Sequence, residues 1–230
     1  MIEHKRAWEI VQVVILVGMF IVAAIAWGSA PDRIPIHWNA AGEVDGYGGK
    51  FMGLLLTPLI TIGIYFLLKY IPRIDPARRN YETFAGTYLL IRVALLIYLA
   101  FVYVVLVLAI GREETFPVGD LITGSVGVLF IVLGAVMGKF RPNWFAGIRT
   151  PWTLTSKRSW TKTHRAGGWV FIATGVATMI AAFFGSEIAF YAMFAIMIPG
   201  IVFLVAYSYF VWRDDPDKVP AQDVKPADEE

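Results

Sequence analysis

The sequence predicts an all-α membrane protein, a bundle of six transmembrane helices, and three observations support this fold class. Hydrophobic residues make up 57% of the chain and charged residues 17%, whereas soluble domains have about 45–50% and about 25%. Six apolar stretches are each long enough to cross a hydrocarbon core about 30 Å thick. The connections between them are alternately rich and poor in Lys and Arg. A soluble fold is excluded because too few polar residues are present to cover a core.

The six stretches span residues 10–27, 51–71, 84–110, 121–138, 169–185 and 188–212. Each is expected to be helical, since a backbone in lipid must satisfy its own hydrogen bonds and barrel strands alternate and are about half as long. The first stretch follows Lys5 and Arg6, as in a signal peptide. It is longer than a signal core, however, and Pro31 would follow the cleavage site. We therefore expect a retained first helix.

The distribution of cations predicts the orientation of the bundle. Sixteen of the 20 Lys and Arg residues lie in the N-terminus, the second and fourth connections and the C-terminal tail. The first and third connections hold Arg33, Lys50 and Arg112. We therefore expect a multi-pass protein of the inner (cytoplasmic) membrane with both termini in the cytoplasm. The net charge of +2 gives no strong field that would favour direct nucleic acid binding.

One membrane domain is expected over residues 1–212, with no separate soluble domain. It divides into an N-terminal two-helix part, residues 1–84, and a C-terminal part, residues 120–212. Residues 29–50, the outer motif loop, follow the first helix, and residues 139–168, the inner motif loop, follow the fourth. The tail, residues 213–230, is rich in Asp, Glu, Lys, Pro and Ala and lacks the apolar area to fold, so it is predicted to be disordered in the cytoplasm.

The outer motif loop combines turn-forming glycines with polar and aromatic side chains. Candidate ligand- or partner-binding residues are His37, Trp38, Asn39, Gly42, Asp45 and Lys50. One interpretation is an ordered lid, in which Trp38 and Tyr47 anchor the loop at the interface while Asp45 and Lys50 hold its turns. Another is a ligand site, or a divalent cation held by His37, Glu43 and Asp45. The spacing of these three residues matches no fixed metal signature, so no metal site is predicted.

The inner motif loop contains three tryptophans among seven cations, which suits a segment at headgroup depth in contact with membrane lipid. Ser156 is expected to cap a short interfacial helix between the fourth and fifth spans, on which Trp160, Thr163 and His164 share one face. The mixture of Asn, Gly, Pro and Thr indicates a defined backbone, either a structured anchor or a binding site. Candidate ligand- or partner-binding residues are Asn143, Trp144, Gly147, Arg149, Thr150, Pro151, Trp152, Trp160, Thr163 and His164.

The polar residues form no catalytic pattern. His164 lies in no Ser–His–Asp order or HExxH segment, and the chain has no cysteine. We predict no enzymatic activity, no catalytic residue and no cofactor.

Arg92 lies about two turns inside the third stretch, where a buried charge is expensive. It either snorkels to the inner headgroups or belongs to a functional site. In the fourth stretch Gly134 and Gly138 form a GxxxG pair, which predicts a close helix contact within the bundle.

Both motif loops resemble known sequence signatures. Residues 143–154, followed by Trp160 and residues 163–165, resemble the signature of the SdpI family of bacterial membrane proteins. The outer motif loop, with Pro35, His37, Trp38 and Lys50, is similar to the N-terminal domain of unknown function often fused to that family. The resemblance covers nearly the whole chain except the acidic tail.

The resemblance implies immunity to, or sensing of, an extracellular peptide toxin. It further implies a receptor role, in which a cytoplasmic repressor protein is retained at the membrane when the toxin is present. The outer motif loop would contact the peptide, and the inner motif loop would transmit the signal or serve as an anchor. The alternative is a small transporter or channel that uses a midplane site near Arg92.

Overall fold

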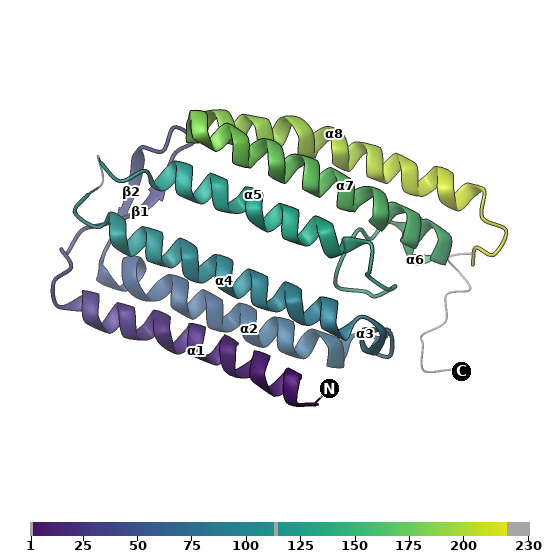
Figure 1. Ribbon diagram of the computed structural model, residues 1–230, viewed down its shortest axis with the longest axis horizontal. Helices are drawn as coiled ribbons and strands as arrows, with labels where there is room; N and C mark the ends of the chain where they lie inside the picture. The colour runs from purple at the N-terminus through teal and green to yellow at the C-terminus, as the bar shows by residue number, and fades with distance from the viewer. Residues whose placement is uncertain (1, 113–114, 220–230) are drawn as a thin grey trace.

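The computed structural model describes residues 2–112 and 115–219. Long helices run side by side along one axis (Figure 1): α1 (Ile2–Trp27), α2 (Leu56–Ile74), α4 (Ala85–Ala109), α5 (Val118–Met137), α7 (Lys157–Ala181) and α8 (Ser186–Arg213). Within the described residues, 6 helices are long and apolar enough to cross a membrane. The predicted number of spans is therefore confirmed, while the cytoplasmic placement of the termini stays a prediction.

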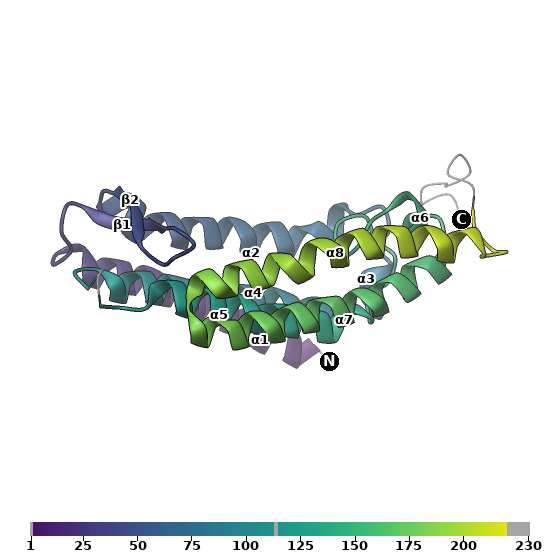
Figure 2. The same cartoon turned by 90° about the horizontal axis from the view of Figure 1, so that it is seen from above.

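Shorter elements occupy the two ends of the bundle (Figure 2). A hairpin of β1 (Ile34–Trp38) and β2 (Val44–Gly48) lies at one end, followed by a π-helix, η1 (Phe51–Leu55). The single turns α3 (Asn80–Thr83) and α6 (Pro151–Leu154) lie at the other end. A 3₁₀ turn, η2 (Ala182–Phe184), joins α7 to α8.

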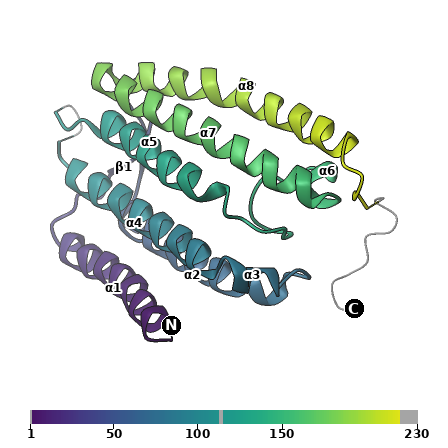
Figure 3. The ribbon, with the colours of Figure 1, turned by 45° about the vertical axis from the view of Figure 1, so that its right-hand side comes forward.

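The long helices form two groups (Figure 3). Helices α1, α2 and α4 make up the N-terminal group, and α5, α7 and α8 make up the C-terminal group, in which α7 packs extensively against both neighbours. The contact between α4 and α5, which joins the groups along their length, is less extensive. The bundle therefore consists of two three-helix units joined mainly through α4 and α5.

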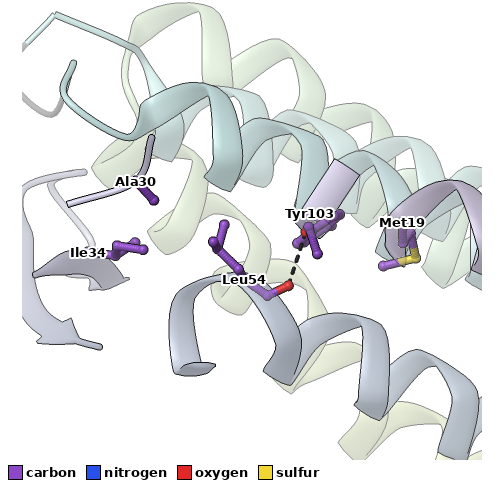
Figure 4. Close-up of a cluster of buried hydrophobic side chains, with 6 residues drawn as sticks. Met19, Ala30, Ile34, Leu54 and Tyr103 are labelled. Carbon is purple, nitrogen blue, oxygen red and sulfur yellow. Dashed lines mark hydrogen bonds between the residues drawn. The ribbon is translucent and has the colours of Figure 1, made fainter. Parts of the chain in front are cut away.

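The N-terminal group encloses a small apolar core at the hairpin end (Figure 4). Met19 of α1 and Tyr103 of α4 pack with Leu54 of η1 and Ile34 of β1. The Tyr103 hydroxyl donates a hydrogen bond of 3.0 Å to the Leu54 carbonyl, so the phenol is not left unpaired in an apolar core. A Cβ at Gly53 would overlap with the Ile34 side chain. The hairpin is therefore seated on the start of α2.

In the C-terminal group, α5 and α7 approach each other at two levels through glycines. A Cβ at Gly134 would lie 2.6 Å from the Gly168 carbonyl oxygen. About two helical turns away, a Cβ at Gly127 would lie 2.7 Å from the Gly175 carbonyl oxygen. Small residues allow this close backbone contact. Both glycines of the predicted GxxxG pair face α7, Gly134 against the Gly168 backbone and Gly138 against Arg165.

The hairpin is the main departure from the expected all-α fold. β1 and β2 pair antiparallel, with irregular register around His37. Residues 39–42 make the turn: the Gly42 amide donates to the Asn39 carbonyl at 3.0 Å, and Gly42 has φ of +83°. A polar connection of this length can satisfy its backbone groups by pairing with itself.

The boundary of α7 also differs from the sequence prediction. Residues 157–168, expected in the inner motif loop, form the first turns of α7, and the Ser156 hydroxyl accepts from the Ser159 amide as its N-cap. The expected separate helix after Ser156 is therefore wrong, because that segment continues into the span. The short helix of this loop is instead α6, capped by Thr150.

Part of the predicted disordered tail has a defined conformation. The Val219 amide donates to the Thr155 carbonyl at 2.9 Å, and Asp215 is buried against Ser156. Residues 214–219 therefore contact the start of α7, while the disorder predicted for the tail stays a prediction. Residues 220–230 lie outside the described residues.

Candidate functional site

The inner motif loop is joined to the connection between α2 and α4 through Asn143. This side chain is almost fully buried, at 1% exposure. Its Oδ1 accepts from the Phe145 amide at 3.0 Å and the Ala146 amide at 2.6 Å, and its Nδ2 donates to the Arg141 carbonyl at 2.9 Å. The Tyr81 hydroxyl, from α3, lies 3.3 Å from the same Oδ1. Asn143 therefore fixes the backbone of its own loop and ties it to α3.

Asp75, at the end of α2, also contacts both α3 and the inner motif loop. Its Oδ2 accepts from the Tyr81 hydroxyl at 2.8 Å and from the Trp144 amide at 3.0 Å. Burial, followed by the hydrogen bond to Asp75, raises the pKa of Tyr81, so the phenol remains protonated and able to donate. Nearby, Asn80 Nδ2 donates to the Pro142 carbonyl at 2.7 Å. The N-terminal group is thus held to the inner motif loop by a buried hydrogen-bond network.

His164 of α7 contacts the inner motif loop from another side. Its Nε2 accepts from the Ile148 amide at 3.0 Å, and its Nδ1 contacts the Trp160 carbonyl at 2.8 Å. This pattern requires a neutral ring with the proton on Nδ1. The ring stacks on Trp160 at 4.1 Å between centroids. Above it, Gly147 has φ of +105°, and a Cβ there would overlap with the imidazole.

Trp160 and His164 are both fully buried and satisfied, so their part in the motif is to hold the loop. The indole Nε1 of Trp160 donates to the Phe140 carbonyl at 3.0 Å. Thr163, the third residue on this face, is also buried, and its Oγ1 makes no hydrogen bond to any residue that the structure describes. The predicted shared face is therefore present but points inward rather than toward a ligand.

Helix α8 provides a third set of contacts. Thr150 Oγ1 lies 3.0 Å from Ser208 Oγ, and Ser159 Oγ donates to the Ser208 carbonyl at 2.8 Å. Ser156 Oγ donates to Asp215 just after α8. The inner motif loop therefore contacts both helix groups at one end of the bundle.

The remaining inner candidates lie at the surface. Trp144, Arg149 and Pro151 are exposed, and Arg149 donates to the Trp144 carbonyl at 2.5 Å. Trp152 is half-buried and packs edge-on against Tyr209 at 5.3 Å. These side chains are the part of the motif that a lipid or partner could reach.

At the opposite end, the hairpin brings His37 and Asp45 into contact through Nδ1 and Oδ1. Their side chains are 70% and 45% exposed. Glu43 does not join them: its carboxylate accepts from Asn39 Nδ2 at 3.1 Å. Among the described residues, no group of three or more His, Cys, Asp or Glu could hold a metal ion. The alternative of a cation held by His37, Glu43 and Asp45 is therefore not supported by the arrangement.

The other outer candidates anchor the hairpin. Trp38 packs against a buried cluster of α4 and α5 that includes Val105 and Val118. Lys50 Nζ donates to the Trp27 carbonyl at 3.3 Å, which ties the hairpin to the end of α1. The hairpin turn touches α8, because Ser186 Oγ donates to the Ala40 carbonyl at 3.0 Å. This end therefore resembles the predicted lid, with His37 and Asp45 on its exposed surface.

Arg92 is buried and pairs with Glu9 of α1 at 3.0 Å. The second oxygen of Glu9 accepts from the Tyr65 hydroxyl at 2.9 Å and from Lys69 at 3.2 Å. Arg92 thus has a carboxylate partner within the bundle.

Several residues of these networks were not predicted: Glu9, Asp75, Asn80, Tyr81, Ser208 and Asp215. The polar Asp75 at the end of an apolar run, directly before Pro76, was the one available signal in the connection between α2 and α4. Glu9, at the polar start of the first apolar run, could have been proposed as the partner of Arg92 by charge alone.

Comparison with known proteins identifies both motif loops. The SdpI/YfhL protein family matches residues 139–208, which contain the inner motif loop, and the domain of unknown function DUF1648 matches residues 14–62, which contain the outer one. The chain is 26% identical over 206 residues to the immunity protein SdpI of Bacillus subtilis (strain 168), covering 89% of this chain and 96% of that protein. No solved structure matches.

Proposed function

We propose that this multi-pass bacterial membrane protein protects its cell against an extracellular peptide toxin, since the SdpI/YfhL family matches its inner motif loop and DUF1648 matches its outer one. The observation that carries the proposal is the similarity to an immunity protein along 89% of the chain. Shared hydrophobicity alone does not readily explain two matching segments that contain motif loops at opposite ends of one bundle. Immunity is therefore the function that the chain supports best.

The hairpin is the proposed contact with the peptide. His37 and Asp45 lie side by side on its exposed surface, where a cationic or polar peptide could replace their mutual contact. Trp38 and the Ser186 contact seat the hairpin on α4, α5 and α8, so an event at the hairpin reaches both helix groups. This arrangement supports sensing as well as protection.

The inner motif loop is the proposed contact with a cytoplasmic repressor. Its buried residues fix the backbone, and Trp144, Arg149 and Pro151 remain exposed on a rigid support. A preorganised surface costs less entropy to bind than a flexible loop. Signalling across the membrane would then require a change in the contacts between the two helix groups.

Protection can be tested in bacteria that lack immunity and are sensitive to the peptide toxin countered by SdpI. Expression of the parent protein should restore growth in the presence of the toxin. The double variant His37→Ala/Asp45→Ala should lose protection, whereas Asp32→Ala, fully exposed in the same loop, should keep it. Killing that is unchanged by the parent protein, at equal membrane levels, would remove the immunity proposal for this toxin.

Signalling is tested separately with a fluorescent repressor fusion. Toxin should move the repressor to the membrane in cells with the parent protein, and Arg149→Glu should prevent this while leaving protection intact. Loss of both responses together would instead indicate that the loop is needed for folding.

The alternative, a small transporter or channel, rests on the Glu9–Arg92 pair inside the helix bundle. The cavity beside Arg92 is also lined by Arg78, Arg79 and Tyr81, so it lies at one end of the bundle rather than at its middle. A midplane site would be needed for transport by this fold. The position of the cavity therefore favours the immunity proposal.

A further inference from the structure

A cavity of about 660 Å³, the arginine cavity, lies beside Arg92 at the end of the bundle that carries α3. Ionic side chains of both signs line it, and arginines outnumber carboxylates: Arg73, Arg78, Arg79 and Arg92 against Glu9 and Glu82. The described side chains that line the cavity therefore carry more positive than negative charge and would favour an anion.

The carboxylate of Glu9 cannot neutralise this cavity by itself. One of its oxygens pairs with Arg92, and the other already accepts from Tyr65 and Lys69. Both carboxylate oxygens of Glu9 are therefore already engaged. A phosphate in the cavity would supply further acceptors for the exposed arginines that line it.

An apolar groove of about 870 Å³ continues from the arginine cavity, with which it shares Glu82, Ala85 and Leu89. The groove follows α4 as far as Ile97, and Val132 of α5 lines it as well. From Ala85 to Ile97 the helix rises about 18 Å. A third cavity of about 810 Å³ shares Ile97 and Val132 and extends the same surface. We call this continuous surface the α4 groove.

We propose that the arginine cavity and the α4 groove together bind one anionic phospholipid. Its phosphate would lie among the arginines, and an acyl chain would lie along α4. The order of the two surfaces, cationic at the end of the bundle and apolar along a spanning helix, matches the order of headgroup and tail in a bilayer. A peptide toxin is a poorer occupant, because the site lies at the opposite end from the exposed hairpin.

The lipid also has a structural role in this site. Contact between α4 and α5 is less extensive than the contacts of α7 with α5 and α8, and the α4 groove lies along this junction. A lipid chain in the groove would add contact area between the two helix groups. Phospholipid binding should therefore be saturable, and it should also raise the stability of the protein.

The test measures thermal unfolding and native mass spectra of the detergent-purified protein with added lipid. Phosphatidylglycerol should raise the unfolding temperature of the parent and bind as a single retained adduct, whereas phosphatidylcholine should do so weakly. The double variant Arg73→Gln/Arg79→Gln alters two exposed arginines of the cavity. It should bind phosphatidylglycerol on the order of tenfold more weakly, since each cation near an anionic surface contributes modestly.

Arg141→Gln is the matched control, because Arg141 is exposed, lies in the inner motif loop and does not line the arginine cavity. It should keep the preference of the parent. The unfolding temperature in phosphatidylcholine reports whether each variant is folded, and Arg79→Gln alone replaces the double variant if that one fails.

Three results would overturn the proposal. Phosphatidylglycerol and phosphatidylcholine could stabilise the parent equally, or the cavity variant could keep the full preference. Inorganic phosphate alone could also reproduce the whole shift, which would indicate a free-anion site without a role for the groove. Conversely, Ala94→Trp, which fills the groove, should weaken lipid binding and leave any response to inorganic phosphate unchanged.

Discussion

Replacement of Asn143 by Ala should destabilise the end of the bundle at which the two helix groups meet. The variant removes an acceptor for the Phe145 and Ala146 amides and a donor for the Arg141 carbonyl. Tyr81 also loses its contact with Asn143 but keeps its acceptor, Asp75. The substitution therefore leaves backbone groups unpaired rather than merely deleting a contact.

The expected loss in the free energy of unfolding depends on how well water can hydrogen-bond to the groups that Asn143 leaves unpaired. An unsatisfied buried donor costs about 1–3 kcal/mol. Phe145 is 41% exposed, so its amide can be partly rehydrated, whereas the side-chain position of Asn143 itself is buried. We expect the free energy of unfolding to fall by about 2–3 kcal/mol. Asn80→Ala removes one hydrogen bond of the same junction and should cost about 0.5–1.5 kcal/mol.

The assay is reversible unfolding in mixed micelles with increasing sodium dodecyl sulfate, followed by tryptophan fluorescence. Both variants should remain folded without the denaturant, and Asn143→Ala should be clearly the less stable. A change below about 0.5 kcal/mol for Asn143→Ala would refute the reasoning. So would a loss for Asn80→Ala that equals or exceeds it, because the network would then not be centred on Asn143.

Three further predictions use the same unfolding measurement. Gly147→Ala should cost about 1–3 kcal/mol, since φ of +105° disfavours a side chain and a Cβ would overlap with an imidazole; a neutral result would mean that the loop can move away. Trp160→Phe should cost about 1–3 kcal/mol through its buried hydrogen bond, whereas Trp169→Phe, 74% exposed on the same helix, should change stability by less than about 0.5 kcal/mol. Glu9→Gln and Arg92→Gln should each destabilise, and the double variant should lose less than their sum by about 1 kcal/mol or more; strict additivity would contradict a direct ion pair.

The six spans could be predicted because a hydrocarbon core demands long apolar helices and tolerates little else. The start of α7 could not, because residues such as Lys157 and Lys162 lower its mean hydropathy, while Thr163 and His164 are buried by protein rather than lipid. Hydropathy measures transfer into lipid and cannot distinguish a loop from a polar helix end that packs inside the bundle.

The candidate sites were predicted as residue types but not as arrangements. Gly147 and Asn143 indicated a defined backbone, yet Tyr81, which Asn143 contacts, is 62 residues away and only folding brings the two together. Arg92 was recognised as a costly charge, but Glu9 is 83 residues away on another helix. Spacing along one helix can identify a face, whereas pairing between helices depends on the order in which they pack.

The glycine contacts between α5 and α7 have a thermal consequence. Separating two helices inside a bilayer exposes their surfaces to lipid chains, which are as apolar as the helices, and not to water. The large positive heat-capacity change of unfolding comes from apolar surface meeting water. The close contacts at Gly134 and Gly168 should therefore depend on packing enthalpy that varies little with temperature. The free energy that holds the helices of the C-terminal group together should decline almost linearly on heating and should not decrease on cooling.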